Sequence, residues 1–376
     1  MNSTEISIES GKPSKEEDTL NTPVNTWGFE MTGMVCEHCD WSYLIPTSIP
    51  IPICPHCFRT TLTPLTDQLE QLPYVHPPEL VLPFTFPDSK LETVIQSFVK
   101  GIPFALEDMT LKNLKNRLKR LYLPMWLVDI DVEASWKAET GFNYQVVSHV
   151  EHYEQNRGGW SSKEVSESRV RWEPRLGSLT RKYQNIVAPA LEEHVNLTKY
   201  LREFDLSTSV GYHSEEVNNT FICLPNRTSE DAWNEAKPVI QAAAAEECRQ
   251  AAGADQIRQF SWEAEFKNQS WSLLLIPVLT TYYQDDNKQA ELVLLHGQTG
   301  RVSGKRQASM NRAKKTALGV LLASVLFFLF SILIASASLF FPALLAIGML
   351  GFVISLIVGL GAVVPIATVW WFNRNQ

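Results

Sequence analysis

The chain has 376 residues, of which 45% are apolar and 20% are charged, the balance of an ordinary globular protein. This balance excludes a chain that is disordered throughout, and the length allows two or three domains. The average conceals one asymmetry, because no charged side chain occurs from Thr316 to Asn373, a run of 58 residues. A single bilayer crossing takes about 20 residues. The sequence therefore predicts a membrane protein with a large soluble part.

Charge is also unevenly distributed along the chain, whose formal net charge is -8. Six basic residues and no acidic residue lie between positions 301 and 315. Without these six and Arg374, residues 1 to 300 carry a formal charge of -15. We expect an acidic body and a basic juxtamembrane collar, which consists of Arg301, Lys305, Arg306, Arg312, Lys314 and Lys315.

The N-terminal segment changes character twice before the soluble domain begins. Residues 1–26 are polar and acidic without apolar periodicity, and they lack the apolar core of a signal peptide. We predict a disordered acidic tail there. Prolines are frequent in residues 67–80, which predicts a linker between a first domain at 27–66 and a soluble domain at 81–300.

The first domain contains the strongest chemical motif, two Cys-x-x-Cys pairs with fourteen residues between them. Each pair presents two thiolates from one turn, so two pairs complete the tetrahedral shell of a structural zinc ion. With all four positions filled by protein, no coordination site remains for water or substrate, and catalytic zinc is not expected. His38 and His56, inside the two pairs, are expected to face solvent. The predicted ligands are Cys36, Cys39, Cys54 and Cys57.

Nucleic-acid binding by this predicted zinc ribbon is disfavoured by its charge. Residues 27–66 contain one basic side chain, Arg59, and three acidic ones, whereas phosphate contact needs clustered Lys and Arg. The apolar tract at 44–53 instead predicts a hairpin that docks onto protein. Docking onto the neighbouring domain of the same chain and docking onto another protein are equal alternatives.

The soluble domain combines both kinds of secondary structure and predicts the α+β class with an antiparallel sheet. Period-2 alternation is clearest at 126–133, where Trp126 and Val128 alternate with Asp129. Capping residues and apolar periodicity predict helices at 88–98, 110–120 and 228–252, the last kinked at Pro238 and ended by Gly253. Further strands are predicted at 142–153, 164–173, 178–187, 257–267, 271–283 and 289–296.

Two arrangements resemble catalytic sites and are better explained structurally. Asp129, Asp131 and Glu133 share one strand face, and His149 and Glu151 share another, so an acid-base or metal site would form if the faces met. The simpler interpretation is the polar outer face of an antiparallel sheet. The segment 300–306 resembles a phosphate-binding loop but lacks the first glycine and the magnesium-binding hydroxyl. It is expected to close a hairpin. We expect no enzyme activity, and we expect Cys223 and Cys248 to be unpaired and buried.

The uncharged C-terminal run predicts two transmembrane helices, at about 316–335 and 343–371. The basic collar before the first helix predicts a cytoplasmic soluble domain and cytoplasmic termini, because positive charge resists translocation. A stripe of small residues on the second helix permits close helix packing and consists of Gly351, Ser355 and Gly359. We expect it to pack within the helical hairpin against Gly319 and Ala323. Contact between copies in a homo-oligomer is the alternative.

The order of these motifs resembles a bacterial family of TFIIB-type zinc-ribbon membrane proteins, whose automatic names borrow from the primosomal helicase. The resemblance rests on the two Cys-x-x-Cys pairs, the segments 122–129 and 275–278, the Gly-rich segment 297–304 and the terminal membrane hairpin. It implies a multi-pass protein of the inner or plasma membrane that binds zinc. Some members resemble a membrane partner of flotillin-like and phage-shock proteins in envelope stress.

The function expected from these observations is that of a non-enzymatic scaffold or adaptor, anchored in the bilayer and facing the cytoplasm. Its expected partners are the lipid bilayer and another protein, of the flotillin-like or phage-shock type in view of the resemblance. A membrane-tethered zinc-ribbon protein that binds nucleic acid is the alternative function. A hydrolase that uses the faces of Asp129 and His149 is a third hypothesis.

Overall fold

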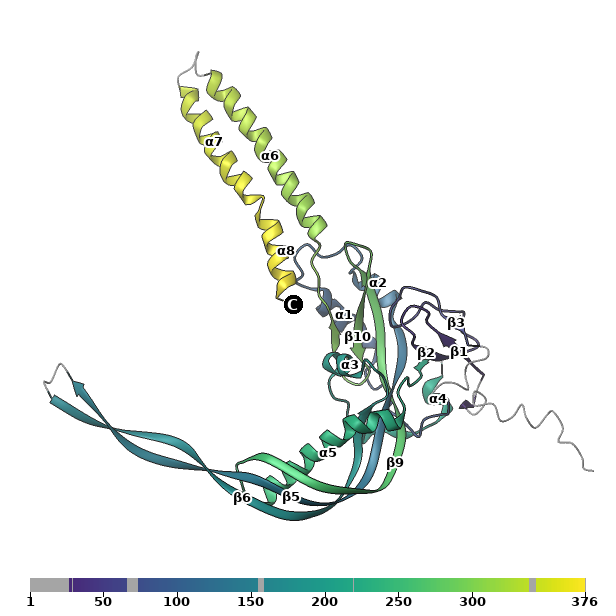
Figure 1. The fold of residues 1–376 in the computed structure, drawn as a ribbon. Helices are drawn as coiled ribbons and strands as arrows, with labels where there is room; N and C mark the ends of the chain where they lie inside the picture. The colour runs from purple at the N-terminus through teal and green to yellow at the C-terminus, as the bar shows by residue number, and fades with distance from the viewer. Residues whose placement is uncertain are drawn as a thin grey trace, which may run out of the picture.

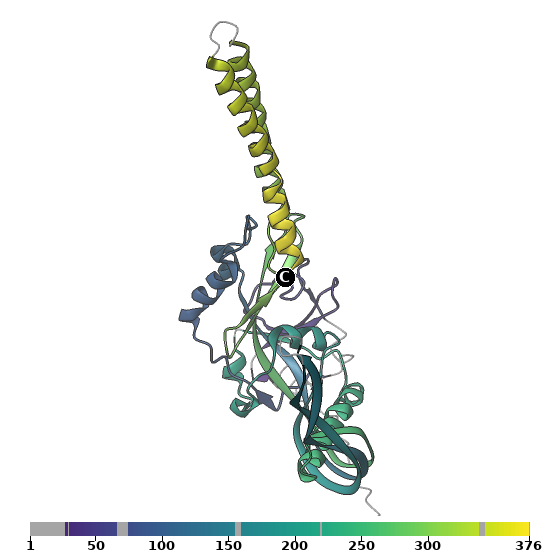
Figure 2. The same cartoon turned by 90° about the vertical axis from the view of Figure 1, so that its left-hand side faces the viewer.

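The computed structural model describes residues 27–28, 30–65, 74–154, 159–218, 220–337 and 343–375. The tail predicted at 1–26, the last residue of the predicted first domain, Thr66, and the first part of the predicted linker, residues 67–73, lie outside the described residues. In Figure 1 a helical hairpin leaves one end of the body and a two-stranded arm leaves the opposite end. Figure 2 shows the same separation after a quarter turn.

One sheet runs through the whole body, with the strand order β11-β10-β9-β5-β8-β2-β1-β3. Most pairs are antiparallel, as predicted, but the β5–β8 and β4–β9 pairs are parallel. Strand β6 pairs with β5, and β4 pairs with β7 and β9. The strands are β1 Met31–Val35, β2 Ser42–Pro46, β3 Thr63–Pro64, β4 Leu80–Val81, β5 Lys119–Glu154, β6 Gly159–Pro189, β7 Val210–Gly211, β8 Phe221–Cys223, β9 Gln256–Gln284, β10 Ala290–His296 and β11 Val302–Gly304.

The first and third predicted helices of the soluble domain are present, and the second is shorter than predicted. It ends at Asn116 rather than near residue 120 because β5 begins at Lys119. The longest soluble helix passes Pro238 without interruption, so the helix is not broken at this proline. The helices are α1 Leu91–Val99, α2 Leu111–Asn116, α3 His194–Leu201, α4 Ser214–Val217, α5 Ser229–Ala251, α6 Met310–Ser336, α7 Ala343–Gly361 and α8 Val364–Arg374.

The three central strands are much longer than predicted. Polar residues that would end a strand are accommodated within it: Asn268 adopts a φ of 52° at an irregularity between β9 and β5. A bulge of this kind lets a strand bend without ending. Predicted strands 126–133 and 142–153 merge into β5, 164–173 and 178–187 merge into β6, and 257–267 and 271–283 merge into β9.

Strands β5 and β9, which have neighbours on both sides, each contain one proline, at a kind of position where proline is normally excluded. Each lies where the outer neighbour of its strand changes. On β5, strand β8 pairs as far as Tyr122 and β6 begins at Met125, so Pro124 falls between them. On β9, β4 pairs up to Leu275 and β10 begins beyond Pro277. Neither proline therefore has an outer partner that would need its missing N–H.

Helix α5 covers the inner side of the bend that β5, β6 and β9 make (Figure 1). It packs on Ile130 and Val132 of β5, both fully buried. The small side chains of its buried face let the helix approach the sheet closely. Their spacing of four residues gives one face of a helix, and they are Ala232, Ala236, Ile240, Ala244 and Cys248.

Beyond Gly141 the sheet narrows to two strands. Gly141 makes the last pairing of β5 with β9, and α5 ends nearby at Ala251. Residues 142–154 of β5 pair with residues 159–171 of β6, and we call this two-stranded segment the arm. The side of β5 that α5 covers nearer the body continues along the arm as Phe142, Tyr144 and Val146, and none of the described helices lies over it there (Figure 1).

The helical hairpin consists of α6 packed along α7 and α8. Ser324 of α6 donates a hydrogen bond of 2.7 Å from its hydroxyl to the Ser355 carbonyl. A Cβ added at Gly351 would clash with the Ser331 hydroxyl, and one added at Gly359 would lie 2.9 Å from the Ser324 hydroxyl. The predicted stripe of small residues therefore lies against α6 within the hairpin.

The partner face predicted on α6 is wrong. Gly319 and Ala323 are exposed, whereas Ala317, Ser324 and Ser331 are buried. The buried residues recur every seven positions, the spacing at which two helices remain in contact along their length. The second predicted helix, 343–371, is also divided between Gly361 and Val364, just before a proline that removes a helical N–H.

The base of the helical hairpin is fixed to the body. The Ala308 N–H donates 2.8 Å to the side-chain oxygen of Asn373, whose amide donates 3.0 Å back to the Ala308 carbonyl. Helix α6 begins earlier than the predicted residue 316, because Ser309 caps it by accepting from the Arg312 N–H at 3.0 Å. Asp286 anchors that cap, accepting 2.6 Å from the Ser309 hydroxyl.

Candidate metal centre

The two Cys-x-x-Cys pairs form two turns of the same geometry. In each turn the residue after the second cysteine has a positive φ, 58° at Asp40 and 53° at Phe58. Its N–H donates to the carbonyl of the first cysteine, at 2.8 Å from Asp40 to Cys36 and at 3.1 Å from Phe58 to Cys54. Because both Cys-x-x-Cys pairs adopt the same turn, each pair presents its two thiols in the same way.

The four cysteine sulfurs converge on one point. Their Sγ atoms all lie within 4.8 Å of one another, and no disulfide joins them. Cys36 and Cys57 are 3.5 Å apart, and Cys39 and Cys54 are 3.7 Å apart. Four sulfurs that surround one point can hold a metal ion, and this is the group of ligands predicted from the sequence.

The ionisation of these thiols is mutually dependent. The contact with Cys39 lowers the pKa of Cys54 to about 4, and the same contact together with burial raises the pKa of Cys39. Burial raises the pKa of Cys57 to about 11. Four thiolates at this distance repel one another unless a cation lies between them, and a metal ion supplies that charge.

The two histidines inside the motifs have different environments. His38 is exposed, as predicted, with its Nε2 2.9 Å from Arg59. The prediction for His56 is wrong, because only 15% of its side chain is exposed. Its ring stacks on Trp41 at a centroid distance of 3.8 Å, and Nε2 lies 3.1 Å from the Glu193 carboxylate. Glu193 is 137 positions away along the chain, so no local pattern indicated this contact.

The ribbon docks onto its own chain. Strand β2 pairs with β8 through Tyr43–Cys223 and Leu44–Ile222, so the ribbon is a continuation of the central sheet. Cys36 and Cys54 belong to one apolar cluster with residues of β5 and β9. Only the first part of the apolar tract at 44–53 packs on the sheet, since the side chains of Ile51 and Ile53 in its second part are 56% and 47% exposed.

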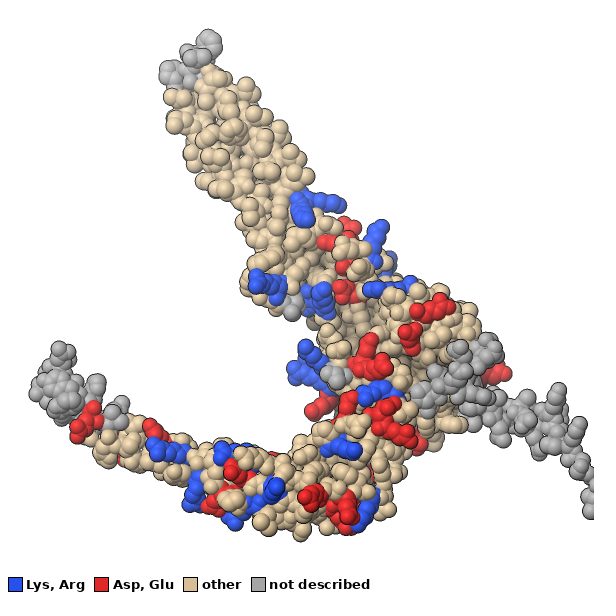
Figure 3. Space-filling view, viewed as in Figure 1, with Lys and Arg blue, Asp and Glu red and all other residues tan. Residues whose placement is uncertain are grey.

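The six collar residues divide into two groups. Arg306 and Arg312 donate to backbone carbonyls of the body, at 2.6 Å to Lys100 and 2.7 Å to Ala105. Lys305 lies 3.5 Å from the Glu291 carboxylate. Figure 3 shows basic side chains around the base of the uncharged helical hairpin. The other three collar residues are exposed: Arg301 lies at the turn between β10 and β11, and Lys314 and Lys315 lie near the start of α6.

The carboxylates considered for catalysis have structural partners in the sheet. Asp129 accepts 2.8 Å from the Asn185 N–H, Asp131 accepts 2.8 Å from the Asn268 amide, and Glu133 pairs with Lys267 at 2.7 Å. His149 lies on the same strand 20 residues further on, about 65 Å away at the usual rise of a strand. The two faces therefore do not meet, and the hypothesis of a hydrolase site there is wrong.

The segment that resembles a phosphate loop is a tight turn between β10 and β11. A Cβ at Gly297 would lie 2.5 Å from the Pro277 carbonyl oxygen. Gly300 has a φ of 69°, and a Cβ there would clash with Phe86. These glycines are needed for close packing and turn geometry, so the segment closes a hairpin as predicted.

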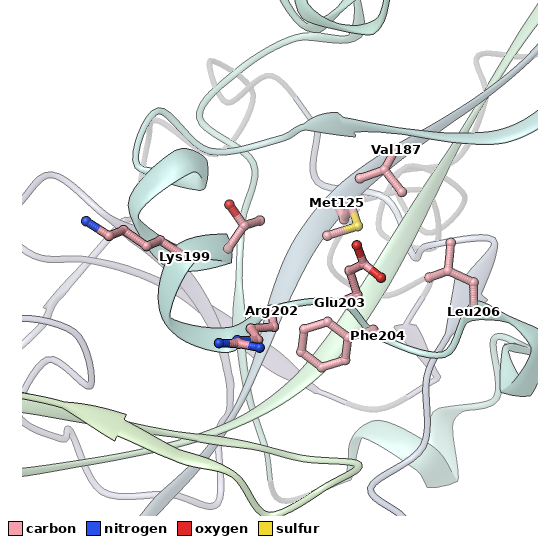
Figure 4. Close-up of a pocket in the computed structure, with 8 residues that line it drawn as sticks. Met125, Val187, Lys199, Arg202, Glu203, Phe204 and Leu206 are labelled. Atoms are coloured by element: carbon pink, nitrogen blue, oxygen red, sulfur yellow. The ribbon is translucent and has the colours of Figure 1, made fainter. Parts of the chain in front are cut away.

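A cavity of about 1040 Å³ lies beside α3 and is shown in Figure 4. Met125, Val187 and Phe204 give it an apolar wall, and Glu203 contributes a carboxylate between Met125 and Phe204. The Lys199 side chain points away from Met125 and Val187 (Figure 4). The sequence did not indicate this cavity, because its lining comes from β5, β6, α3 and the segment after α3.

Comparisons with protein-family models, with curated proteins and with solved structures give no match for this chain. The conclusions about the site therefore rest on its own geometry.

Proposed function

We propose that this protein is a non-enzymatic scaffold, anchored in the plasma membrane by its helical hairpin and organising other envelope proteins on the cytoplasmic face. One observation carries the proposal. The apolar helical hairpin and the exposed arm project from opposite ends of one continuous sheet (Figure 1). A membrane anchor is thereby connected through a packed core to a long surface that can bind protein.

Zinc is the proposed metal, and the sulfur geometry supports it. A tetrahedral zinc ion with Zn–S bonds of about 2.3 Å separates its sulfurs by about 3.8 Å. Two of the sulfur pairs are 3.5 Å and 3.7 Å apart, and all four sulfurs lie within 4.8 Å of one another. Because four cysteines would fill the shell, the ion would stabilise the ribbon and its junction with the sheet. A reducing cytoplasm keeps such thiols available for the metal.

The exposure of the helical hairpin supports its insertion in a bilayer. Two helical segments, Met310–Ser336 and Leu344–Arg374, are long and apolar enough to span a membrane. Large side chains on them are open, with Leu326 68% and Leu360 76% exposed. Such a surface is unfavourable in water and favourable in lipid. The basic collar supports a cytoplasmic body, since positive residues resist translocation.

Cysteine labelling tests this topology in intact cells. We expect a membrane-impermeant thiol reagent to label a cysteine introduced at Ser338, between the two helices. A cysteine at Lys314 should be labelled only after the membrane is made permeable, because it lies in the collar. Labelling of the Lys314→Cys variant from outside would contradict the cytoplasmic orientation and, with it, the proposed scaffold.

A crosslinked pull-down from native membranes tests the scaffold itself. The matched variant replaces residues 143–170 with an Asn-Gly turn, which joins the paired residues Phe142 and Arg171 and leaves the body intact. We expect a specific protein to be recovered with the full chain and lost with the shortened arm. Flotillin-like and phage-shock proteins are the first to examine, given the resemblance. Recovery of nucleic acid instead would favour the alternative function.

A further inference from the structure

The outer edge of β6 is an unused backbone surface. Within the described residues, this strand of 31 residues pairs with β5 along one edge and has no strand on the other. An unpaired edge exposes N–H and C=O groups that can pair with another chain. In the arm β5 supplies the only neighbouring strand, and an isolated two-stranded ribbon is marginally stable in water. The arm therefore gains most from an added strand.

The charges on this edge are self-complementary. Glu167 and Arg169 are both exposed and lie on either side of Ser168, with 3.2 Å between their charged groups. If two copies of β6 pair antiparallel with Ser168 opposite Ser168, Glu167 of each copy lies opposite Arg169 of the other. Opposite charges at directly facing positions stabilise a strand pair, and like charges destabilise it.

The same charges exclude neighbouring registers. A shift of the axis by one residue toward the N-terminus places Glu167 opposite Glu167, and a shift by one toward the C-terminus places Arg169 opposite Arg169. In the Ser168 register, Ser166 lies opposite Val170 and Val165 lies opposite Arg171. No like charges therefore face each other between residues 164 and 172. Charges that served only to prevent association could all have the same sign, whereas here one acidic and one basic residue flank Ser168.

Apolar side chains would also be covered by a larger sheet. Phe142, Tyr144 and Val146 continue the face that α5 covers nearer the body, and Tyr144 is 47% exposed. Val165 lies on the same face, opposite Ser148. In a four-stranded sheet made from two arms, these side chains from both copies would form one surface rather than two narrow ones.

We propose that β6 of the arm pairs antiparallel with β6 of a second copy of this chain, about a two-fold axis through Ser168. The paired arms form a four-stranded sheet that connects two anchored bodies. This inference goes beyond the proposed function, because it requires neither zinc nor a recruited envelope protein.

Disulfide crosslinking of the full chain tests the register. Directly opposite residues of an antiparallel pair are about 5 Å apart, so the Ser168→Cys variant should form a covalent dimer when oxidised. The Ser178→Cys variant is the matched control, because its two copies would be separated by 20 residues along the strands. Ser166→Cys mixed with Val170→Cys should give covalent heterodimers, whereas Ser166→Cys alone should not. Equal crosslinking of Ser168→Cys and Ser178→Cys would overturn the proposal.

Charge reversal tests the same interface without cysteines. Glu167→Arg alone and Arg169→Glu alone should each weaken self-association by about tenfold, since each change replaces two attractive pairs with two repulsive ones. The double variant Glu167→Arg/Arg169→Glu restores both attractive pairs and should restore the association. Light scattering of the full chain in detergent measures it. A dimer insensitive to all three variants, or a native chain that is monomeric at every concentration, would refute the pairing.

Discussion

Strand β5 passes through two different environments. Its inner part, residues 119–141, has strands on both sides and α5 over one face, and Ile130 and Val132 are fully buried. Its outer part, residues 142–154, has β6 alone, and Tyr144 and Val147 are 47% and 53% exposed. Both parts alternate apolar and polar side chains. Alternating apolar and polar side chains are therefore compatible with a strand in both environments. How much the strand contributes to the free energy of unfolding depends on the strands and helices that pack against it.

The largest expected effect comes from replacing one of the four converging cysteines, and it should differ between the inner part of β5 and the arm. We expect one zinc ion per chain, lost in the Cys54→Ser variant, with a decrease of more than about 3 kcal/mol in the free energy of unfolding. The inner part of β5 should lose protection from hydrogen exchange, because the ribbon joins it through β8. The arm should be unaffected.

Cys248→Ser provides the control for this change. Cys248 is also buried, on α5, but it is not among the four cysteines that converge. Metal analysis and thermal unfolding measure the two variants side by side. An unchanged zinc content in Cys54→Ser would contradict the proposed ligands.

Shortening one apolar side chain in each part of β5 tests the comparison directly. Ile130→Ala should decrease the free energy of unfolding by about 3 kcal/mol, because it leaves a cavity under α5. Val147→Ala should change it by less than about 0.5 kcal/mol, because Val147 is exposed. Denaturant unfolding measures both values. Equal losses would show that the arm is covered more fully than its exposure indicates.

The helical hairpin offers the same comparison between a covered and an uncovered position. Gly351→Val should destabilise the packing of α6 on α7 by about 2 kcal/mol, because the new side chain meets Ser331. Gly319→Val is the control, since an added Cβ there meets nothing within 4 Å. Thermal unfolding in detergent measures the difference. The prediction fails if the two variants are equally stable.

The smallest expected effect is a pH dependence from His296, on the strand next to β9. Burial lowers the pKa of His296, and its Nδ1 accepts from the Gln298 N–H at 3.1 Å. The unfolded chain therefore binds the proton more readily, so stability is retained above about pH 6.5 and decreases as the pH falls below it. His296→Gln should show a smaller decrease in unfolding temperature under acid conditions. An identical decrease in native and variant chains would exclude His296 as its source.

The sequence predicted those features that depend on residues close together in the chain. The four cysteines were identified because each pair sits on one short turn, and the helical hairpin because composition alone determines it. The role of His56 was missed, since its partner Glu193 comes from a distant helix end. The inner half of β5 and the arm were not joined into one strand, because Gly141 and its polar neighbours resemble a turn. Neighbouring strands override such local signals.

The hydrogen bonds between Ala308 and Asn373 have a mechanical consequence. They join the start of the first helix to the end of the last, so the helical hairpin meets the sheet at two points and cannot swivel on a single linker. In the proposed membrane anchor, a bilayer of different thickness would change the tilt of these helices, and the two-point connection would carry that rotation into the sheet. The arm extends about 40 Å beyond Gly141. A tilt of about 10° would thus shift the tip by roughly 7 Å relative to Gly141, so that the position of the arm would depend on membrane thickness.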